Sequence, residues 1–190
     1  MIDWIIRSMK LEKIFSCMLF GIFLFLSFIP SSNGGESDLF QKVGAKQMKV
    51  RKWAPNFSLD DLNGQKVELK NFKGKVIFLN FWATWCGPCK EEMPSMESLW
   101  QGFKERDFVL LSISVDYEGV KSVKEYVEKQ QYSFRVLVDP QCKILDLYEV
   151  KAIPTTFIID KKGQVLAVAT GPKNWKSPEA ISLVDLLIKE

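Results

Sequence analysis

Histidine is absent from this 190-residue chain. Its absence excludes a Ser-His-Asp triad, a cysteine nucleophile activated by histidine, and a zinc site with imidazole ligands. It also excludes c-type haem attachment, which requires Cys-x-x-Cys-His, because Lys90 follows the second cysteine of the Cys-x-x-Cys pair. The chemistry of the chain must therefore come from other side chains.

The chain also lacks a large excess of positive or negative charge. The formal net charge is +3, and lysine and arginine form no cluster, so no nucleic-acid partner is expected. The composition, 47% hydrophobic and 26% charged, is that of a globular protein, and the length suffices for one domain with a substantial core. No internal repeat is visible.

The N-terminal region has the pattern of an export segment. Arg7, Lys10 and Lys13 precede an uncharged, apolar run at residues 14–30. This pattern is typical of a signal peptide, and its length is at the lower limit for a membrane-spanning helix. We therefore predict that residues 1–35 are a signal peptide or an N-terminal membrane anchor. The rest of the chain is then expected outside the cytoplasm in the cell envelope, periplasmic or on the outer membrane face, anchored or secreted.

A linker and one folded domain are predicted after this segment. Residues 36–52 are polar and lack periodicity, which favours a linker. The folded domain is expected over residues 53–190. It begins with alternating apolar residues around Asn63-Gly64, a strong hairpin signal.

The rest of the domain alternates between strands and helices. Continuous apolar runs at residues 75–82 and 108–115 predict strands buried on both faces, and a helical pattern begins between them at Pro88. Further along, the patterns predict a helix at 120–130, a short strand at 136–138, a short helix at 144–148, a hairpin at 155–170 and a final helix from Ser177-Pro178. This order predicts an α/β fold with a mixed sheet and helices on both faces.

The stretch Trp85-Cys86-Gly87-Pro88-Cys89 carries the strongest chemical signal. It follows a predicted strand and starts a predicted helix, where unpaired backbone N–H groups and the helix dipole favour a thiolate. A structural disulfide is the alternative in an exported protein. The tight Gly87-Pro88 turn and the flanking tryptophan favour a redox motif instead. We expect Cys86 to attack a disulfide and Cys89, one turn further in, to resolve the product.

Two motifs resemble those of the thioredoxin superfamily. Residues 80–90 (NFWATWCGPCK) resemble its active-site stretch, and residues 152–157 (AIPTTF) resemble its second signature. The resemblance covers residues 53–190 and implies a thioredoxin-like fold with a central mixed sheet and an N-terminal β-hairpin extension. It also implies a cis Ile153–Pro154 bond facing the cysteines. The implied substrate surface consists of Trp85, Gly87, Pro88, Ile153 and Pro154, along which an extended peptide docks like an added strand.

Within this superfamily the chain is most similar to the tethered TlpA-like and ResA-like proteins. The export segment, the Pro55-Asn56-Phe57 entry, the lead-in at residues 72–75 and the run at residues 91–94 support this. Asn80 stands where cytoplasmic thioredoxins carry a buried aspartate, and an amide cannot relay a proton. The resemblance implies that Glu92 assists deprotonation of Cys89 instead.

The predicted activity is that of a thiol–disulfide oxidoreductase which reduces protein disulfides in the cell envelope. Cytochrome c maturation, with apocytochrome c as substrate, is one pathway that the resemblance implies. The Gly87-Pro88 dipeptide is that of ordinary thioredoxins and also fits a more general reductant. No metal or organic cofactor is expected, because the cysteine pair carries the electrons. An upstream membrane thiol reductase is expected as a partner, and an uncleaved N-terminal segment would hold the protein at the membrane.

Two other functions use the same residues. A Cu(I) carrier would combine Cys86 and Cys89 with the thioethers of Met93 and Met96. A thiol peroxidase would use a lone reactive cysteine after a proline and a threonine; Thr84 is present, but no proline lies just before it. Cys142 is either an incidental thiol or a third redox-active one.

Overall fold

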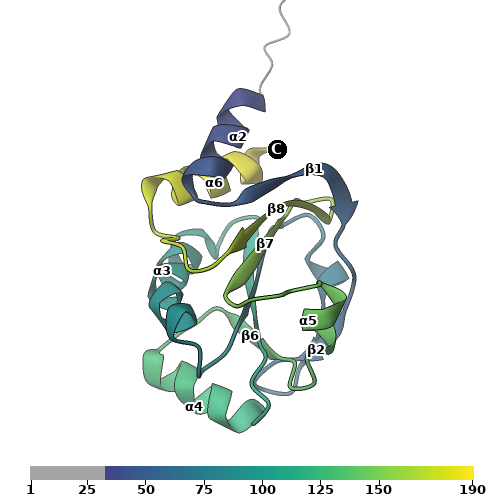
Figure 1. Cartoon of the computed structure of the whole chain (residues 1–190), viewed down its shortest axis with the longest axis vertical. Helices are drawn as coiled ribbons and strands as arrows, with labels where there is room; N and C mark the ends of the chain where they lie inside the picture. Colours follow the sequence, from purple (N-terminus) through teal and green to yellow (C-terminus); the bar gives the residue numbers. More distant parts are fainter. Residues whose placement is uncertain (1–32) are drawn as a thin grey trace, which may run out of the picture. The chain divides into compact units, whose positions relative to one another are not determined.

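A six-stranded mixed sheet forms the centre of the computed structural model, which describes residues 33–190 (Figure 1). Its strand order is β1-β8-β7-β4-β5-β6. The strands are β1 (Lys46–Trp53), β4 (Val76–Trp82), β5 (Phe108–Ser114), β6 (Arg135–Val138), β7 (Thr155–Ile159) and β8 (Gln164–Thr170). Strands β4, β5 and β6 are parallel to one another, whereas β7 runs antiparallel to β4, β8 to β7, and β1 to β8. The predicted mixed sheet is confirmed.

Helices and a separate hairpin cover the two faces of this sheet. The helices are α2 (Asn33–Lys42), α3 (Gly87–Phe103), α4 (Val120–Gln130), α5 (Lys143–Leu147) and α6 (Pro178–Lys189), with a short 3-10 turn, η1 (Leu69–Phe72). Figure 1 shows α3, α4 and α6 on one side and α5 with the hairpin on the other. The hairpin pairs β2 (Ser58–Asp60) with β3 (Lys66–Glu68), as the Asn63-Gly64 turn predicts.

Strand β4 is buried along its whole length because it supplies core residues to both faces. On one face Phe78 packs edge-on against Phe108 and Trp175, and Trp82 packs against Tyr126 of α4. On the other face Phe81 contacts the ring of Tyr148, next to α5. A continuous apolar run, rather than an alternating one, is what a strand with two covered faces requires.

The segment predicted to be a linker, residues 36–52, is part of the folded domain. Residues 35–190 form one compact unit, in which α2 buries Phe40 and β1 pairs antiparallel with β8. Strand β1 escapes a pattern-based prediction because it lies at the sheet edge. All its side chains are exposed or only partly buried, and backbone pairing holds it in place. The prediction of a linker, and of a domain that starts at residue 53, is therefore wrong.

The apolar run predicted as a signal peptide or membrane anchor lies outside the described residues. Within residues 33–190, no helix is long and apolar enough to cross a membrane.

Candidate active site

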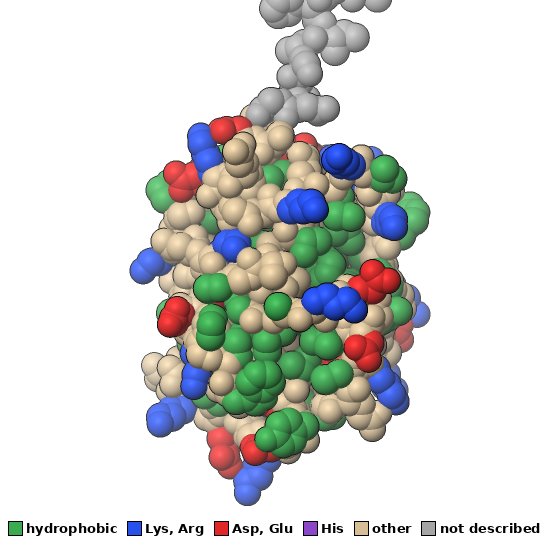
Figure 2. All heavy atoms as spheres, viewed as in Figure 1, with side chains coloured by type: hydrophobic (Ala, Val, Ile, Leu, Met, Phe, Trp, Pro, Cys, Tyr) green, Lys and Arg blue, Asp and Glu red, His purple; other side chains and the backbone are tan. Residues whose placement is uncertain are grey.

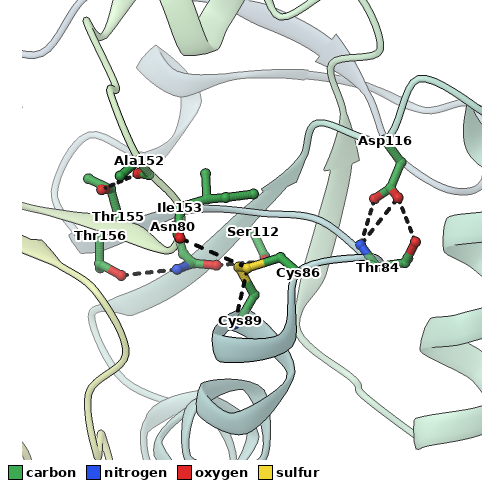
Figure 3. Close-up of a disulfide and its surroundings, with 10 residues drawn as sticks. All are labelled: Asn80, Thr84, Cys86, Cys89, Ser112, Asp116, Ala152, Ile153, Thr155 and Thr156. Atoms are coloured by element: carbon green, nitrogen blue, oxygen red, sulfur yellow. Dashed lines mark hydrogen bonds between the residues drawn. A yellow bond between two sulfur atoms is a disulfide. The ribbon is translucent and has the colours of Figure 1, made fainter.

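The cysteine pair lies at the start of α3, directly after β4. Cys86 is the N-cap residue of the helix, and its sulfur accepts a hydrogen bond from the Cys89 backbone N–H at 3.2 Å. The two sulfurs form a disulfide across a Cα–Cα distance of 5.3 Å (Figure 3). Cys86 is 6% exposed and Cys89 only 1%. The predicted position of the pair at a helix N-terminus is confirmed, and Cys86 is the more accessible thiol.

A second loop faces the disulfide from the start of β7. The Ile153–Pro154 bond is cis, as predicted, and the Ile153 carbonyl oxygen lies 3.9 Å from the Cys86 sulfur (Figure 3). The Thr155 hydroxyl donates to the Ala152 carbonyl at 2.7 Å and holds this loop. The structure thus brings together two motifs that are far apart in the sequence.

The predicted substrate contacts lie on both sides of the disulfide: Trp85, Gly87 and Pro88 at the start of α3, and Ile153 and Pro154 on the loop before β7. Gly87 and Pro88 are exposed, and the Trp85 side chain is 60% exposed. Ile153 is half-buried and Pro154 is buried. A substrate-binding role for these five residues is a proposal that rests on this placement.

A buried, hydrogen-bonded amide lies in the sheet next to the disulfide. Asn80 on β4 donates to the Thr156 hydroxyl at 3.1 Å and accepts from the Ser112 hydroxyl at 3.3 Å (Figure 3). All three side chains are buried. Because an amide does not ionise, this network joins three strands without providing a group that exchanges protons.

The ionisable group near the cysteines is Glu92, one turn after Cys89 on α3. Its side chain is 2% exposed and accepts a hydrogen bond from the indole N–H of Trp175. Burial raises the pKa of the Glu92 carboxyl from 4.5 to about 7, although the Trp175 hydrogen bond and the charge of Lys173 lower it. A carboxyl that titrates near neutral pH suits proton transfer to and from a thiol.

Two site residues could not be singled out from the sequence. Trp175, which contacts Glu92, lies in the loop before α6 and belongs to no motif; its backbone N–H donates to the Ser95 hydroxyl at 3.0 Å. Asp116 follows β5 and accepts hydrogen bonds from Thr84, in the loop before Cys86. Its place after the strand parallel to β4 is the one available signal, because the carboxyl ends of adjacent parallel strands meet at one edge.

Residues named for the other functions have ordinary structural surroundings. Met93 and Met96 are buried in the core, at 1% and 0% exposure, where their thioethers pack against apolar neighbours. Cys142 is partly buried before α5, and burial together with the charges of Asp139 and Asp146 raises the pKa of its thiol. A raised pKa disfavours the reactive thiolate at Cys142.

This fold and site define a class of thioredoxin-like proteins in which a Cys-x-x-Cys helix faces a cis-proline loop. The model of the AhpC/TSA family matches residues 50–168. The chain belongs to the AhpC/TSA family.

Curated proteins and solved structures similar to this chain are thiol–disulfide oxidoreductases and related proteins by name. A thiol-disulfide oxidoreductase ResA from Bacillus cereus is 42% identical over 126 residues, which cover 66% of this chain and 72% of that protein. The ResA of Bacillus subtilis is 42% identical over 118 residues, 62% of this chain and 65% of that protein. A crystal structure of a putative thiol:disulfide interchange protein DsbE from Chlorobium tepidum has a TM-score of 0.64 at 30% identity and covers 75% of this chain and 96% of its own. The prediction of a ResA-like thiol–disulfide oxidoreductase is confirmed.

Proposed function

We propose that the protein reduces disulfides of other proteins in the cell envelope, with Cys86 as nucleophile and Cys89 as resolving thiol. The observation that carries the proposal is the position of the Cys86 sulfur, at a helix N-terminus and 3.9 Å from the Ile153 carbonyl of the cis-proline loop. A polypeptide that lies along this loop presents its disulfide to Cys86.

The reaction requires the dithiol form of the pair. The Cys86 thiolate attacks one sulfur of the substrate disulfide, a mixed disulfide forms, and the other substrate sulfur leaves as a thiolate. The Cys89 thiolate then attacks the Cys86 sulfur, which closes the enzyme disulfide and releases the second substrate sulfur. Two electrons pass to the substrate, and the structure shows the enzyme in the resulting oxidised state.

Glu92 supports the second step in this proposal. Cys89 is buried and must lose its proton before it attacks, and the Glu92 carboxyl, on the same helix, has a pKa of about 7. Above that pH the carboxylate accepts the thiol proton, either directly or through water.

The proposed location and partners follow from the N-terminal sequence and the relatives. The charged and apolar N-terminal segment directs the domain across the membrane and anchors it there if it is not cleaved. In an oxidising compartment an upstream membrane dithiol must return the pair to its reduced form. Cytochrome c maturation is the proposed pathway, with apocytochrome c as a substrate.

A trapping experiment tests the mechanism. In a Cys142→Ser background, which removes the remaining thiol of the folded domain, Cys89→Ser should accumulate mixed disulfides on Cys86 that dithiothreitol releases. The matched control, Cys86→Ser in the same background, should accumulate none. Absence of adducts from the Cys89→Ser protein would contradict the order of the two attacks.

Equilibration of the Cys86–Cys89 pair in glutathione or dithiothreitol buffers tests the direction. A reductase requires a potential well below that of strong oxidants, so a value near or above about −120 mV would identify the protein as an oxidant instead.

A further inference from the structure

Two adjacent loops, at the end of the sheet from which the chain enters the cysteine pair, each present one exposed aromatic side chain. Strands β4 and β5 are parallel, and Trp82 pairs with Ser114 at the point where both end. The Val115 backbone N–H then donates to the Trp82 carbonyl at 2.9 Å, so the two chains leave the sheet together. The loop after β4 carries Trp85, which is 60% exposed, and the loop after β5 carries Tyr117, which is 75% exposed.

The buried carboxylate of Asp116 joins these loops. It is 2% exposed, and its two oxygens accept the Thr84 backbone N–H at 3.2 and 3.0 Å and the Thr84 hydroxyl at 2.5 Å (Figure 3). The Ser114 hydroxyl donates to it at 2.6 Å and accepts from the Asp116 backbone N–H at 3.2 Å. Hydrogen bonds to a buried charged group are strong, and breaking one leaves the partner unsatisfied.

These hydrogen bonds restrain the backbone of the two loops that carry Trp85 and Tyr117. Thr84 directly precedes Trp85, and Asp116 directly precedes Tyr117, so these hydrogen bonds hold the backbone directly before each aromatic residue. The Thr84 hydroxyl donates a hydrogen bond to Asp116, so this hydroxyl has a structural role. A contact surface that is held in place before binding loses less conformational entropy when a partner binds.

We propose that Trp85 and Tyr117 form an aromatic contact surface for the polypeptide whose disulfide Cys86 attacks, and that Asp116 is the positioning residue of this surface. This inference rests on the proposed function. Tyrosine and tryptophan are enriched in protein interfaces because they offer a large apolar area with a polar group and few rotatable bonds. Figure 2 shows hydrophobic side chains gathered on the viewed face of the domain, towards the end where α4 lies, with charged side chains around them.

The occupant is an extended apolar segment that flanks the substrate disulfide. The surface is continuous with the nucleophile, since Trp85 precedes Cys86 in the chain. The cis-proline loop binds one side of the disulfide, and the aromatic surface lies on the loops after β4 and β5. A small disulfide has no flanking chain to reach Tyr117, whereas a polypeptide does. Discrimination between the two kinds of substrate is therefore the property to measure.

Steady-state reduction of oxidised insulin and of 5,5′-dithiobis(2-nitrobenzoate) by Tyr117→Ala tests the contact surface. The KM for insulin, relative to the KM for the small disulfide, should rise about fivefold, the effect of losing one aromatic contact. Tyr117→Phe should restore most of the wild-type ratio. Trp53→Ala, which removes another exposed aromatic residue (67% exposed, on β1), is the control and should leave the ratio unchanged. An unchanged ratio in Tyr117→Ala would overturn the proposal.

Hydrogen exchange tests the positioning role. Asp116→Asn removes an acceptor, so the Thr84 amide should exchange at least tenfold faster and the KM ratio should rise as in Tyr117→Ala. Thr84→Val removes only the hydroxyl donor and should change both readouts in the same direction by less. Unchanged exchange of the residue 84 amide in both variants refutes the role of Asp116. If the wild-type protein reduces neither substrate, the proposed function itself fails, which is distinct from reduction of both with an unaltered ratio in the variants.

Discussion

The buried carboxyl of Glu92 should make the stability of the folded protein depend on pH. Its side chain is 2% exposed, and burial is the main reason why its pKa is raised from 4.5 to about 7. Folding therefore favours the protonated form. The stabilisation is fully present below about pH 4.5 and is lost as the pH rises through the folded-state pKa of about 7.

The magnitude follows from linkage between protonation and folding. For an acid with these two pKa values, ionisation between pH 5 and pH 8 lowers the free energy of unfolding by about 2.5 kcal/mol. Glu92→Gln keeps an oxygen for the Trp175 indole N–H but carries no charge, so it should escape this loss. The unfolding free energy of the variant relative to wild type should therefore increase by about 2.5 kcal/mol from pH 5 to pH 8. A constant cost of the substitution cancels in this comparison.

Urea unfolding of the oxidised protein, followed by tryptophan fluorescence at both pH values, provides the assay. Glu91→Gln is the matched control, because Glu91 is the exposed neighbour on α3 and its charge remains solvated. The reasoning is refuted if Glu92→Gln and wild type lose stability equally between the two pH values. That result would show that burial does not hold the carboxyl neutral. It would also remove the argument that Glu92 acts as a base.

Three further variants test other parts of the structure. Trp175→Phe removes the hydrogen bond that lowers the Glu92 pKa, so alkylation of Cys89 in the reduced protein should reach its half-maximal rate at a higher pH; an unshifted profile would contradict the coupling. Phe40→Ala should lower the free energy of unfolding, measured by urea denaturation, by about 3–5 kcal/mol because this ring is fully buried. A loss below about 1 kcal/mol would show that α2 does not pack as part of the folded domain. Asn80→Asp places an ionisable group in a fully buried network and should destabilise the protein increasingly above pH 5 in thermal unfolding, whereas a pH-independent melting temperature would argue against that burial.

Most of the strands were predictable because they have clear local signals. Strands β4 and β5 are continuous apolar runs, and the β2–β3 hairpin turns at Asn63-Gly64. The N-cap of α6 was equally predictable, because Ser177 precedes Pro178 in the sequence. In the structure the Ser177 hydroxyl accepts a hydrogen bond from the Ala180 N–H at 3.2 Å. In each case the residues that specify the element lie within it or next to it.

Strand β1 shows where local signals end. Its side chains are mostly exposed, so they carry no alternating pattern, and only its register against β8 makes it a strand. Backbone pairing does not depend on side-chain type, and the partner strand lies far along the chain. A polar segment can therefore be mistaken for a linker.

The sequence alone determined the chemistry of the site. Two cysteines that flank Gly87-Pro88 at the start of a helix specify a thiol–disulfide pair, whatever packs around them. The tertiary structure decided what surrounds that pair. It placed the Ile153 carbonyl beside Cys86, it buried Glu92 against Trp175, 83 residues away, and it joined Thr84 to Asp116, 32 residues away. The physical reason is that desolvation and long-range hydrogen bonds depend on which elements pack together, and no local pattern of residues encodes that packing.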